Sequence, residues 1–219
     1  MQDISIWCLD LRQIALAAMR ALLSADEQAR GDRFKMRADH ERFVKSRGAL
    51  RCILAGRTAQ DTRELVFLEG NGRKPALRDH PAVHFNLSHS GDFVLIAAGA
   101  EPLGVDIEAM RDLDARALAA MNFHPDEIAA MEAQADQHAA FFQLWAHKEA
   151  FLKAIGIGLT DQLTSIRTLL GGGRVEAPAS LSSDPWYATP LDTAAGYTAS
   201  IVTRDACPTL HDLTASFLG

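Results

Sequence analysis

Two acidic residues, Asp106 and Glu108, have a spacing that allows them to act together. They lie in the stretch LGVDIE, which has the apolar, β-branched character of a strand. Because side chains alternate between the faces of a strand, residues i and i+2 point the same way. Carboxylates held that close repel each other unless a cation or a donor lies between them. Mg²⁺ suits such a pair, and an exposed, charged strand edge is the alternative.

A third acidic residue, Glu149, lies in the apolar segment 141–159, with the basic residue Lys153 four positions later. The segment contains no proline and ends in Gly156 and Gly158, which predicts a helix with a glycine C-terminus. The i, i+4 spacing puts both charges on one face. Alone, they could be an exposed ion pair worth about 0.3–0.5 kcal/mol. If the helix packs against the LGVDIE strand, Glu149 becomes a third metal ligand.

Two turns carry groups that could bind phosphate. The stretch NLSHS brings Ser88 and His89 to the end of a strand, where the histidine could donate to a phosphate oxygen. Turn propensity alone would also explain the serines. The loop GRKP at 72–75 combines a close backbone approach, two cations and a stiff exit. A generic cationic turn is the alternative for this loop.

The elements that must position these residues are predicted from periodicity and turn signals. Ser24 and Glu27 form a capping box that starts a helical region, which runs with breaks to Ala55 and ends at Gly56. Three strands at short intervals, 83–87, 93–98 and 103–108, predict an antiparallel meander. Other predicted strands are 4–11, 65–68, 166–170, 174–176, 186–189 and 197–202, and the remaining predicted helices are 113–121 and 125–133. We expect two α+β halves, 1–103 and 104–219, that pack tightly.

Composition limits the class of protein. The chain has 219 residues, of which 48% are hydrophobic and 23% charged, as in soluble globular proteins. No apolar run approaches the roughly 18–20 residues that span a bilayer, and we see no signal peptide. Three widely spaced cysteines without a CxxC pair argue against structural zinc and a disulfide framework. We therefore expect a cytoplasmic protein with no membrane partner.

The charge is unevenly distributed. A net charge of -6 argues against a nucleic-acid partner. Between residues 30 and 51, however, basic side chains outnumber acidic ones. Such a segment in an acidic protein suggests a local anion site, and a solvated helix face is the alternative.

Taken in order, the motifs GRKP, FNLSHS, GVDIE and WAHKEAFLKAIGIGL resemble those of the Sfp-type 4′-phosphopantetheinyl transferases. The upstream ARGDRF and the intervening FHPDE resemble that family as well. The likeness extends from about Ile4 to Leu159. It implies a fold of two similar α+β halves related by a pseudo-twofold axis, each with a small, mostly antiparallel sheet and packed helices. Coenzyme A would bind in the cleft between the halves.

The resemblance also implies an activity and a set of roles. The family moves the 4′-phosphopantetheine arm of coenzyme A to a serine of an apo acyl or peptidyl carrier protein, and adenosine 3′,5′-bisphosphate leaves. The residues that match its metal ligands, for Mg²⁺ with Mn²⁺ as the alternative, are Asp106, Glu108 and Glu149. Glu149 is also the candidate base, and Lys153 would face the α-phosphate; with Glu108 these form the expected catalytic set. The residues that match coenzyme A contacts are Arg30, Arg42, Arg73, Lys74, Pro75, Ser88, His89, Lys148 and Lys153, with a structural role as the alternative for Lys148.

Some positions depart from the family pattern. Ala146 replaces a Ser, Thr or Cys, and Glu27 lies where some relatives carry a basic phosphate contact. Phe43 lies where a small hydroxyl residue can occur. None of these changes touches the three carboxylates, so we expect an active enzyme. The resemblance also implies that it is a monomer. By analogy with the family, the carrier would dock on the apolar residues Leu113, Leu118, Met121 and Phe123.

Two other functions compete with transfer. A non-catalytic module that binds coenzyme A or a carrier protein would have no need of all three carboxylates. A Mg²⁺-dependent phosphohydrolase would use water as its nucleophile and would not need the GRKP and SHS turns.

Overall fold

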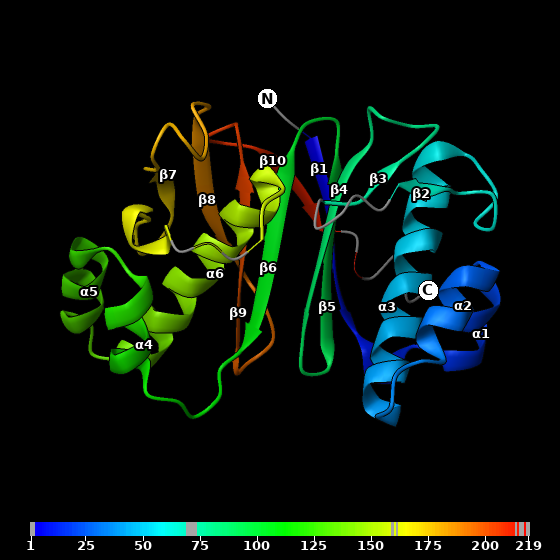
Figure 1. The fold of residues 1–219 in the computed structure, drawn as a ribbon, viewed down its shortest axis with the longest axis horizontal. Helices are drawn as coiled ribbons and strands as arrows, with labels where there is room; N and C mark the ends of the chain where they lie inside the picture. The colour runs from blue at the N-terminus through cyan, green and yellow to red at the C-terminus, as the bar shows by residue number, and fades with distance from the viewer. Residues whose placement is uncertain are drawn as a thin grey trace.

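The computed structural model describes residues 3–68, 74–158, 160, 162–212, 214 and 217 of the chain. Two four-stranded sheets lie side by side at its centre, with helices on either flank (Figure 1). The first sheet has the order β10-β1-β5-β4, with bounds Thr209–Asp212, Asp3–Asp10, Phe93–Gly99 and His84–Ser90. The second has the order β6-β9-β8-β7, with bounds Leu103–Ala109, Tyr197–Thr203, Trp186–Leu191 and Gly173–Val175. The α+β architecture with small, mostly antiparallel sheets is therefore confirmed.

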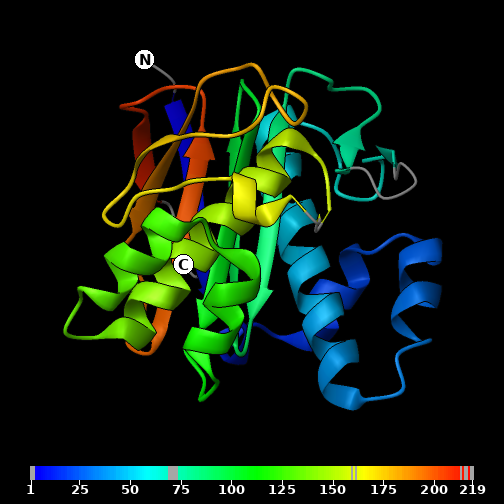
Figure 2. The same cartoon turned by 60° about the vertical axis from the view of Figure 1, so that its left-hand side comes forward.

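Each sheet has its own group of helices, which Figure 2 separates clearly. The first group consists of α1 (Leu16–Leu22), α2 (Ala25–Gly31) and α3 (Arg37–Thr58), after a short turn η1 (Leu11–Gln13). The second group consists of α4 (Ala115–Asn122), α5 (Pro125–Glu132) and α6 (Gln137–Ile155), followed by η2 (Leu163–Ser165). A small hairpin, β2 (Phe67–Leu68) and β3 (Ala76–Leu77), lies beside α3. No helix in the described residues is long and apolar enough to cross a membrane.

The two halves share a core. One cluster of buried side chains combines Ile4, Ile6, Leu95 and Ala97 of the first sheet with Leu103, Val105, Ile107, Ala199 and Ile201 of the second. In addition, β10 comes from the end of the chain yet pairs in parallel with β1 in the first sheet. The second half as delimited from sequence, 104–219, thus contributes a strand to the other half.

The predicted meander is wrong at its third strand. β4 and β5 pair antiparallel, but β6 pairs with β9 and starts the second sheet. Between β4 and β6 a side-chain hydrogen bond replaces the backbone ladder of a sheet. Buried Asn86 Oδ1 accepts a hydrogen bond from Val105 N at 2.8 Å. β6 therefore lies beside the first sheet without belonging to it.

Local sequence signals correctly predict the start of α2 and the end of α6, but not the end of α3. The capping box of Ser24 and Glu27 is confirmed, and α6 ends before Gly156, which has a φ of 75°. Gly56 does not end α3, which continues to Thr58 and closes on Ala59 in the left-handed conformation. A glycine inside a helix costs only about 1 kcal/mol, so the remaining turn can continue past it. The strand predicted at 166–170 is reduced to one bridge between Arg167 and Glu176.

Candidate active site

The two carboxylates of β6 face two serines of β4. Ser88 Oγ donates to Asp106 Oδ1 at 2.8 Å, and Ser90 Oγ donates to Glu108 Oε2 at 3.1 Å. The i, i+2 spacing on one strand is matched by the same spacing on the other. Asp106 and Glu108 thus share a face of β6, as strand alternation predicts, and that face is turned toward β4.

Lys153 on α6 contacts the same pair of strands. Its ammonium group lies 2.6 Å from Asp106 Oδ1 and 2.8 Å from Ser88 Oγ. The interpretation of Lys153 as half of an exposed ion pair with Glu149 is therefore wrong, since its carboxylate partner is on β6. Lys153 reaches Asp106 because α6 packs closely on β6. At Gly104 the two elements are so close that an added Cβ would lie 2.1 Å from Ala150 O of α6.

Among the residues that the structure describes, two buried carboxylate oxygens have no hydrogen-bond partner: Asp106 Oδ2 and Glu149 Oε1. Burial raises the pKa of Asp106 to about 6, although the Lys153 charge opposes the shift. Burial, followed by repulsion from Asp106, raises the pKa of Glu149 to about 7. Unpartnered buried oxygens are costly, so these two atoms mark a place where a proton or a cation is favourable.

The donor chemistry suits a divalent cation. Carboxylate oxygens are the ligands that Mg²⁺ prefers, and two of them are unpaired here. Glu108 lies on the same face of β6, where Arg111 Nη1 approaches its Oε2 at 3.4 Å. No three His, Cys, Asp or Glu side chains within the described ranges already form a metal-ligand cluster. The fit therefore rests on the unpartnered oxygens of Asp106 and Glu149.

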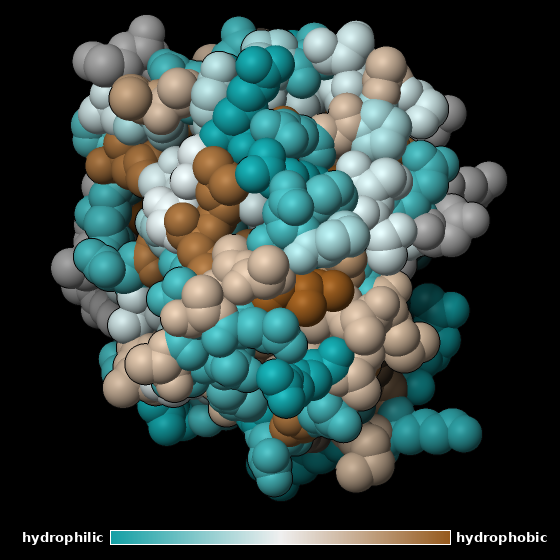
Figure 3. All heavy atoms as spheres, turned by 90° about the vertical axis from the view of Figure 1, so that its left-hand side faces the viewer, coloured by the Kyte–Doolittle hydropathy of each residue, from teal (hydrophilic) through white to brown (hydrophobic). Residues whose placement is uncertain are grey.

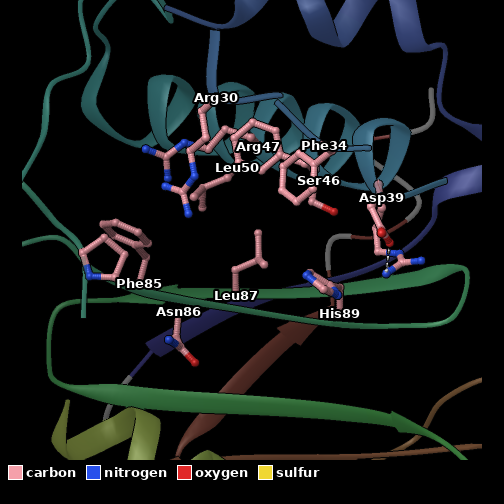
Figure 4. Close-up of a pocket in the computed structure, with 13 residues that line it drawn as sticks. Arg30, Phe34, Asp39, Ser46, Arg47, Leu50, Phe85, Asn86, Leu87 and His89 are labelled. Carbon is pink, nitrogen blue, oxygen red and sulfur yellow. Dashed lines mark ion pairs between the residues drawn. The ribbon is translucent and has the colours of Figure 1, made fainter. Parts of the chain in front are cut away.

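A cavity of about 510 Å³ lies between α3 and β4 (Figure 4). Of the residues matched to coenzyme A contacts, Arg30, Arg42, Pro75 and His89 line it. The other lining residues are Phe34, Asp39, Phe43, Ser46, Arg47, Leu50, Phe85, Asn86 and Leu87. The cavity combines cations with aromatic and aliphatic walls, which suits an anionic ligand with an apolar or aromatic part.

Some of the charge in this cavity is already paired. Arg47 forms an ion pair with Glu27 and lies with its guanidinium 3.8 Å from the centre of the Phe67 ring. Arg42 lies 3.3 Å from Asp39. Burial opposes ionisation of Glu27, but Arg51 and Arg47 outweigh it and the pKa of Glu27 is lowered. The departure noted at Glu27 thus neutralises arginines and stabilises α2 against α3.

Strand β4 connects the cavity with the carboxylates. Leu87 and His89 point toward α3 in Figure 4, whereas Asn86 points away toward β6. Ser88, between Leu87 and His89, contacts Asp106. Consecutive residues Ser88 and His89 therefore belong to adjoining regions, one acidic and one cationic.

Two lysines of the predicted set contact protein groups, and one of them is internal. Lys148 is 1% exposed, pairs with Glu127 at 2.7 Å and donates to the carbonyls of Leu163 and Ile166. Its assignment as a phosphate contact is wrong, and the structural alternative holds. Burial lowers the pKa of Lys148, and Glu127 counteracts it.

Lys74 donates to the carbonyl of Leu103, which begins β6, and burial lowers its pKa to about 8. This lysine joins the two halves next to the cavity. Arg73, expected in the same loop, is outside the described residues.

Sequence reasoning missed several contributors. Ser90 was part of a recognised motif, but its partner lies on another sheet. Asp39 and Arg47 belong to the basic segment. With Phe43 between them they follow at intervals of four residues, which puts all three on one face of a helix. Nothing local signals that Asn86 bonds to β6.

Comparisons with known proteins agree with this arrangement. A profile described as the 4′-phosphopantetheinyl transferase superfamily matches residues 102–202, and one described as 4′-phosphopantetheinyl transferase, N-terminal, matches residues 10–101. The 4′-phosphopantetheinyl transferase HetI of Nostoc sp. is 35% identical over 72% of this chain and 70% of its own. The chain belongs to the 4′-phosphopantetheinyl transferase superfamily.

Other relatives carry the same description. The 4′-phosphopantetheinyl transferase psf-1 of Bacillus pumilus is 37% identical over 69% of this chain and 66% of its own. The 4′-phosphopantetheinyl transferase Sfp of Bacillus subtilis is 28% identical over 81% and 80%. The chain is thus a transferase enzyme, and its two profiles meet at residues 101 and 102, next to the start of β6.

Proposed function

We propose that this phosphopantetheinyl transferase uses coenzyme A as its donor and a serine of an apo carrier protein as its acceptor. Adenosine 3′,5′-bisphosphate is the second product. The main support is that the cationic cavity lies next to the cluster of Asp106, Glu149 and Lys153, with β4 between them. A nucleotide with phosphates suits the cavity, and its pyrophosphate can then reach the cluster.

The reaction is a displacement at phosphorus. The serine Oγ attacks the β-phosphorus, an oxygen–phosphorus bond forms, and the bond to the bridging oxygen breaks. Negative charge collects on the leaving α-phosphate, where the Lys153 ammonium stabilises it. Glu149 accepts the serine proton as the general base. His89 and Arg42 at the cavity wall hold the phosphates in line for attack.

Asp106, Glu108 and Glu149 are the residues that would hold a divalent cation. When bound, Mg²⁺ or Mn²⁺ supplies neutralisation of pyrophosphate charge. Removal of the metal by chelation is expected to abolish transfer, and added Mg²⁺ to restore it.

A direct assay tests the proposal. The chain is incubated with coenzyme A, Mg²⁺ and several apo acyl and peptidyl carrier proteins, and each carrier is weighed by intact mass spectrometry. We expect the mass of one phosphopantetheine to be added at the acceptor serine. No gain on any carrier would contradict carrier modification.

Paired variants connect the assay to the site. Glu149→Gln is expected to lower transfer at least about 100-fold, because it removes a base and a metal ligand. Glu132→Gln, on the neighbouring helix and paired with Arg116 at 3.2 Å, is the matched control and should retain full activity. Release of phosphopantetheine without a carrier would instead favour a phosphohydrolase.

The carrier dock is proposed on α4. Leu118 and Met121 are 36% and 73% exposed there. Figure 3 views the flank of the molecule that carries α4 and α5, where apolar patches are small and broken by polar side chains. Phe123, grouped with them from sequence, is 2% exposed and stacks on Phe141, so it supports the dock from inside.

We further propose that the enzyme acts as a cytoplasmic monomer. The cavity and the acidic cluster are both built within one chain. Cys8, Cys52 and Cys207 are unpaired, which suits a reducing compartment.

A further inference from the structure

Ser90, the last residue of β4, is the only contact from the first sheet to Glu108 that the described side chains record as a hydrogen bond. We propose that Ser90 is a positioning residue for Glu108 and that it thereby raises the affinity of the site for a divalent cation. This inference rests on the proposed function, in which Glu108 is one of the metal ligands.

The hydrogen bonds of Ser90 leave its hydroxyl little freedom. Its Oγ accepts from Ala109 N at 3.0 Å and donates to Glu108 Oε2 at 3.1 Å. A hydroxyl has one proton, and acceptance from Ala109 directs that proton toward the carboxylate. Ser90 thus holds the backbone that follows Glu108 and the side chain of Glu108 at once, which limits the rotamers open to the carboxylate.

The turn that carries Ser90 is itself seated on the second sheet. Gly91 has a φ of +54°, and a Cβ there would lie 2.4 Å from Tyr197 Oη. Asp92 N donates to the same Oη at 3.3 Å. Tyr197 lies opposite Ala109 in the β6–β9 register, so one residue pair anchors both the turn and the strand end. The distance between Ser90 and Glu108 is therefore set by rigid elements.

The other partner of Glu108 holds it less firmly. Arg111 approaches Oε2 at 3.4 Å, and its side chain is 64% exposed. Exposed ion pairs constrain a side chain weakly. The contacts from Ser90 and Arg111 both use Glu108 Oε2, which lies on the same face of β6 as Asp106. The unpartnered Asp106 Oδ2 and Glu149 Oε1 mark the cation position. Ser90 is thus a hydrogen-bond partner of a carboxylate that would ligate the metal. Loss of such a partner typically lowers metal affinity about 10–100-fold.

The test is titration of the full chain with Mn²⁺ alone, with free Mn²⁺ measured by electron paramagnetic resonance. We expect Ser90→Ala to weaken Mn²⁺ binding about 10-fold and Ser90→Thr, which keeps the hydroxyl, to retain it. Ser5→Ala in the same sheet is the matched control, because it also removes a hydroxyl that accepts one hydrogen bond, here from Arg57. Thermal unfolding without metal verifies that all three variants fold.

A kinetic readout separates positioning from general damage. For Ser90→Ala, the Mg²⁺ concentration that gives half-maximal transfer should rise about 10-fold while kcat at saturating Mg²⁺ stays near that of the unsubstituted chain. Unchanged Mn²⁺ affinity in a folded Ser90→Ala, or failure of Ser90→Thr to retain binding, would overturn the inference. Absence of Mn²⁺ binding by the unsubstituted chain would also overturn it. Normal Mn²⁺ binding without transfer to any carrier would sink the proposed function and leave the role of Ser90 standing.

Discussion

Burial opposes the ionisation of Asp106 and Glu149 in the acidic cluster. Asp106 is 2% exposed, and among the described residues its one cationic partner is Lys153, which it shares with Ser88. Glu149 faces the charge of Asp106 from α6, and its Oε1 lies buried without a partner. Strain of this kind is a cost to folding that a bound cation would relieve.

Without metal, the stability of the chain should depend on the ionisation of Glu149. The folded state raises the pKa of Glu149 to about 7, so the native chain binds more protons than the unfolded chain between about pH 4.5 and 7. Stability should therefore fall as pH rises through this window. Glu149→Gln should be more stable than the unsubstituted chain by about 2 kcal/mol at pH 8, with no difference near pH 4. Urea unfolding of the chelated proteins across this range measures it, and equal midpoints at pH 8 would contradict it.

Lys153 should control the ionisation of Asp106. Lys153→Met removes the cation that opposes the burial of Asp106, so the pKa of Asp106 should rise above about 6. The acid limb of the pH–rate profile should then move to higher pH, and the rate should drop at least about 100-fold through loss of leaving-group stabilisation. The exposed Lys35→Met is the control. An unshifted acid limb in the residual activity would argue against this coupling.

At the scale of elements, α6 must lie directly against β6 for these contacts to exist. Gly104 permits this approach, because a Cβ there would lie 2.1 Å from Ala150 O and 2.3 Å from Ala154 N. Both neighbours are backbone atoms of α6, which cannot move independently of the helix. The separation of the two elements therefore decides whether Lys153 reaches Asp106.

We predict that Gly104→Ala destabilises the fold by about 3 kcal/mol or more, because overpacking must displace α6. Surviving folded protein should bind Mn²⁺ weakly. Gly56→Ala is the opposite control, since nothing lies within 4 Å of its added Cβ inside α3, and it should gain about 0.5–1 kcal/mol. Chemical denaturation compares the two, and a neutral Gly104→Ala would show that the β6–α6 spacing is adaptable.

At the scale of the whole molecule, the site exists only because the two sheets meet. The shared core, the Asn86–Val105 bond and the serine–carboxylate pairs all cross from β4 or its sheet to β6. The return of β10 to β1 adds a further connection. The halves should accordingly unfold as one unit.

A variant at this junction tests that cooperativity. Asn86→Ala leaves the buried Val105 N–H without its partner, which should cost about 1–3 kcal/mol. Unfolding should remain a single transition with coincident far-ultraviolet circular dichroism and tryptophan fluorescence, since Trp7 reports on the first sheet and Trp186 on the second. Asn122→Ala, which loses an exposed bond to Leu118, is the control. Two separate transitions would contradict a shared core.

Much of this protein was determined by local sequence. Alternation put Asp106 and Glu108 on one face, apolar spacing with a terminal glycine predicted α6, and the Ser24–Glu27 capping box started α2. These features depend on residues a few positions apart, where backbone geometry fixes which side chains meet. The order of the motifs was enough to indicate the family.

Tertiary structure alone decided which carboxylates pair with Lys148 and Lys153. Lys153 could have met Glu149 one turn away, but packing of α6 on β6 brought it to Asp106 instead. Lys148, next to Glu149 in sequence, turned inward to Glu127. The third strand of the expected meander joined another sheet, because Asn86 and the shared core replaced a ladder. Each outcome depends on burial and on contacts between distant segments, whose energies no local pattern of residues contains.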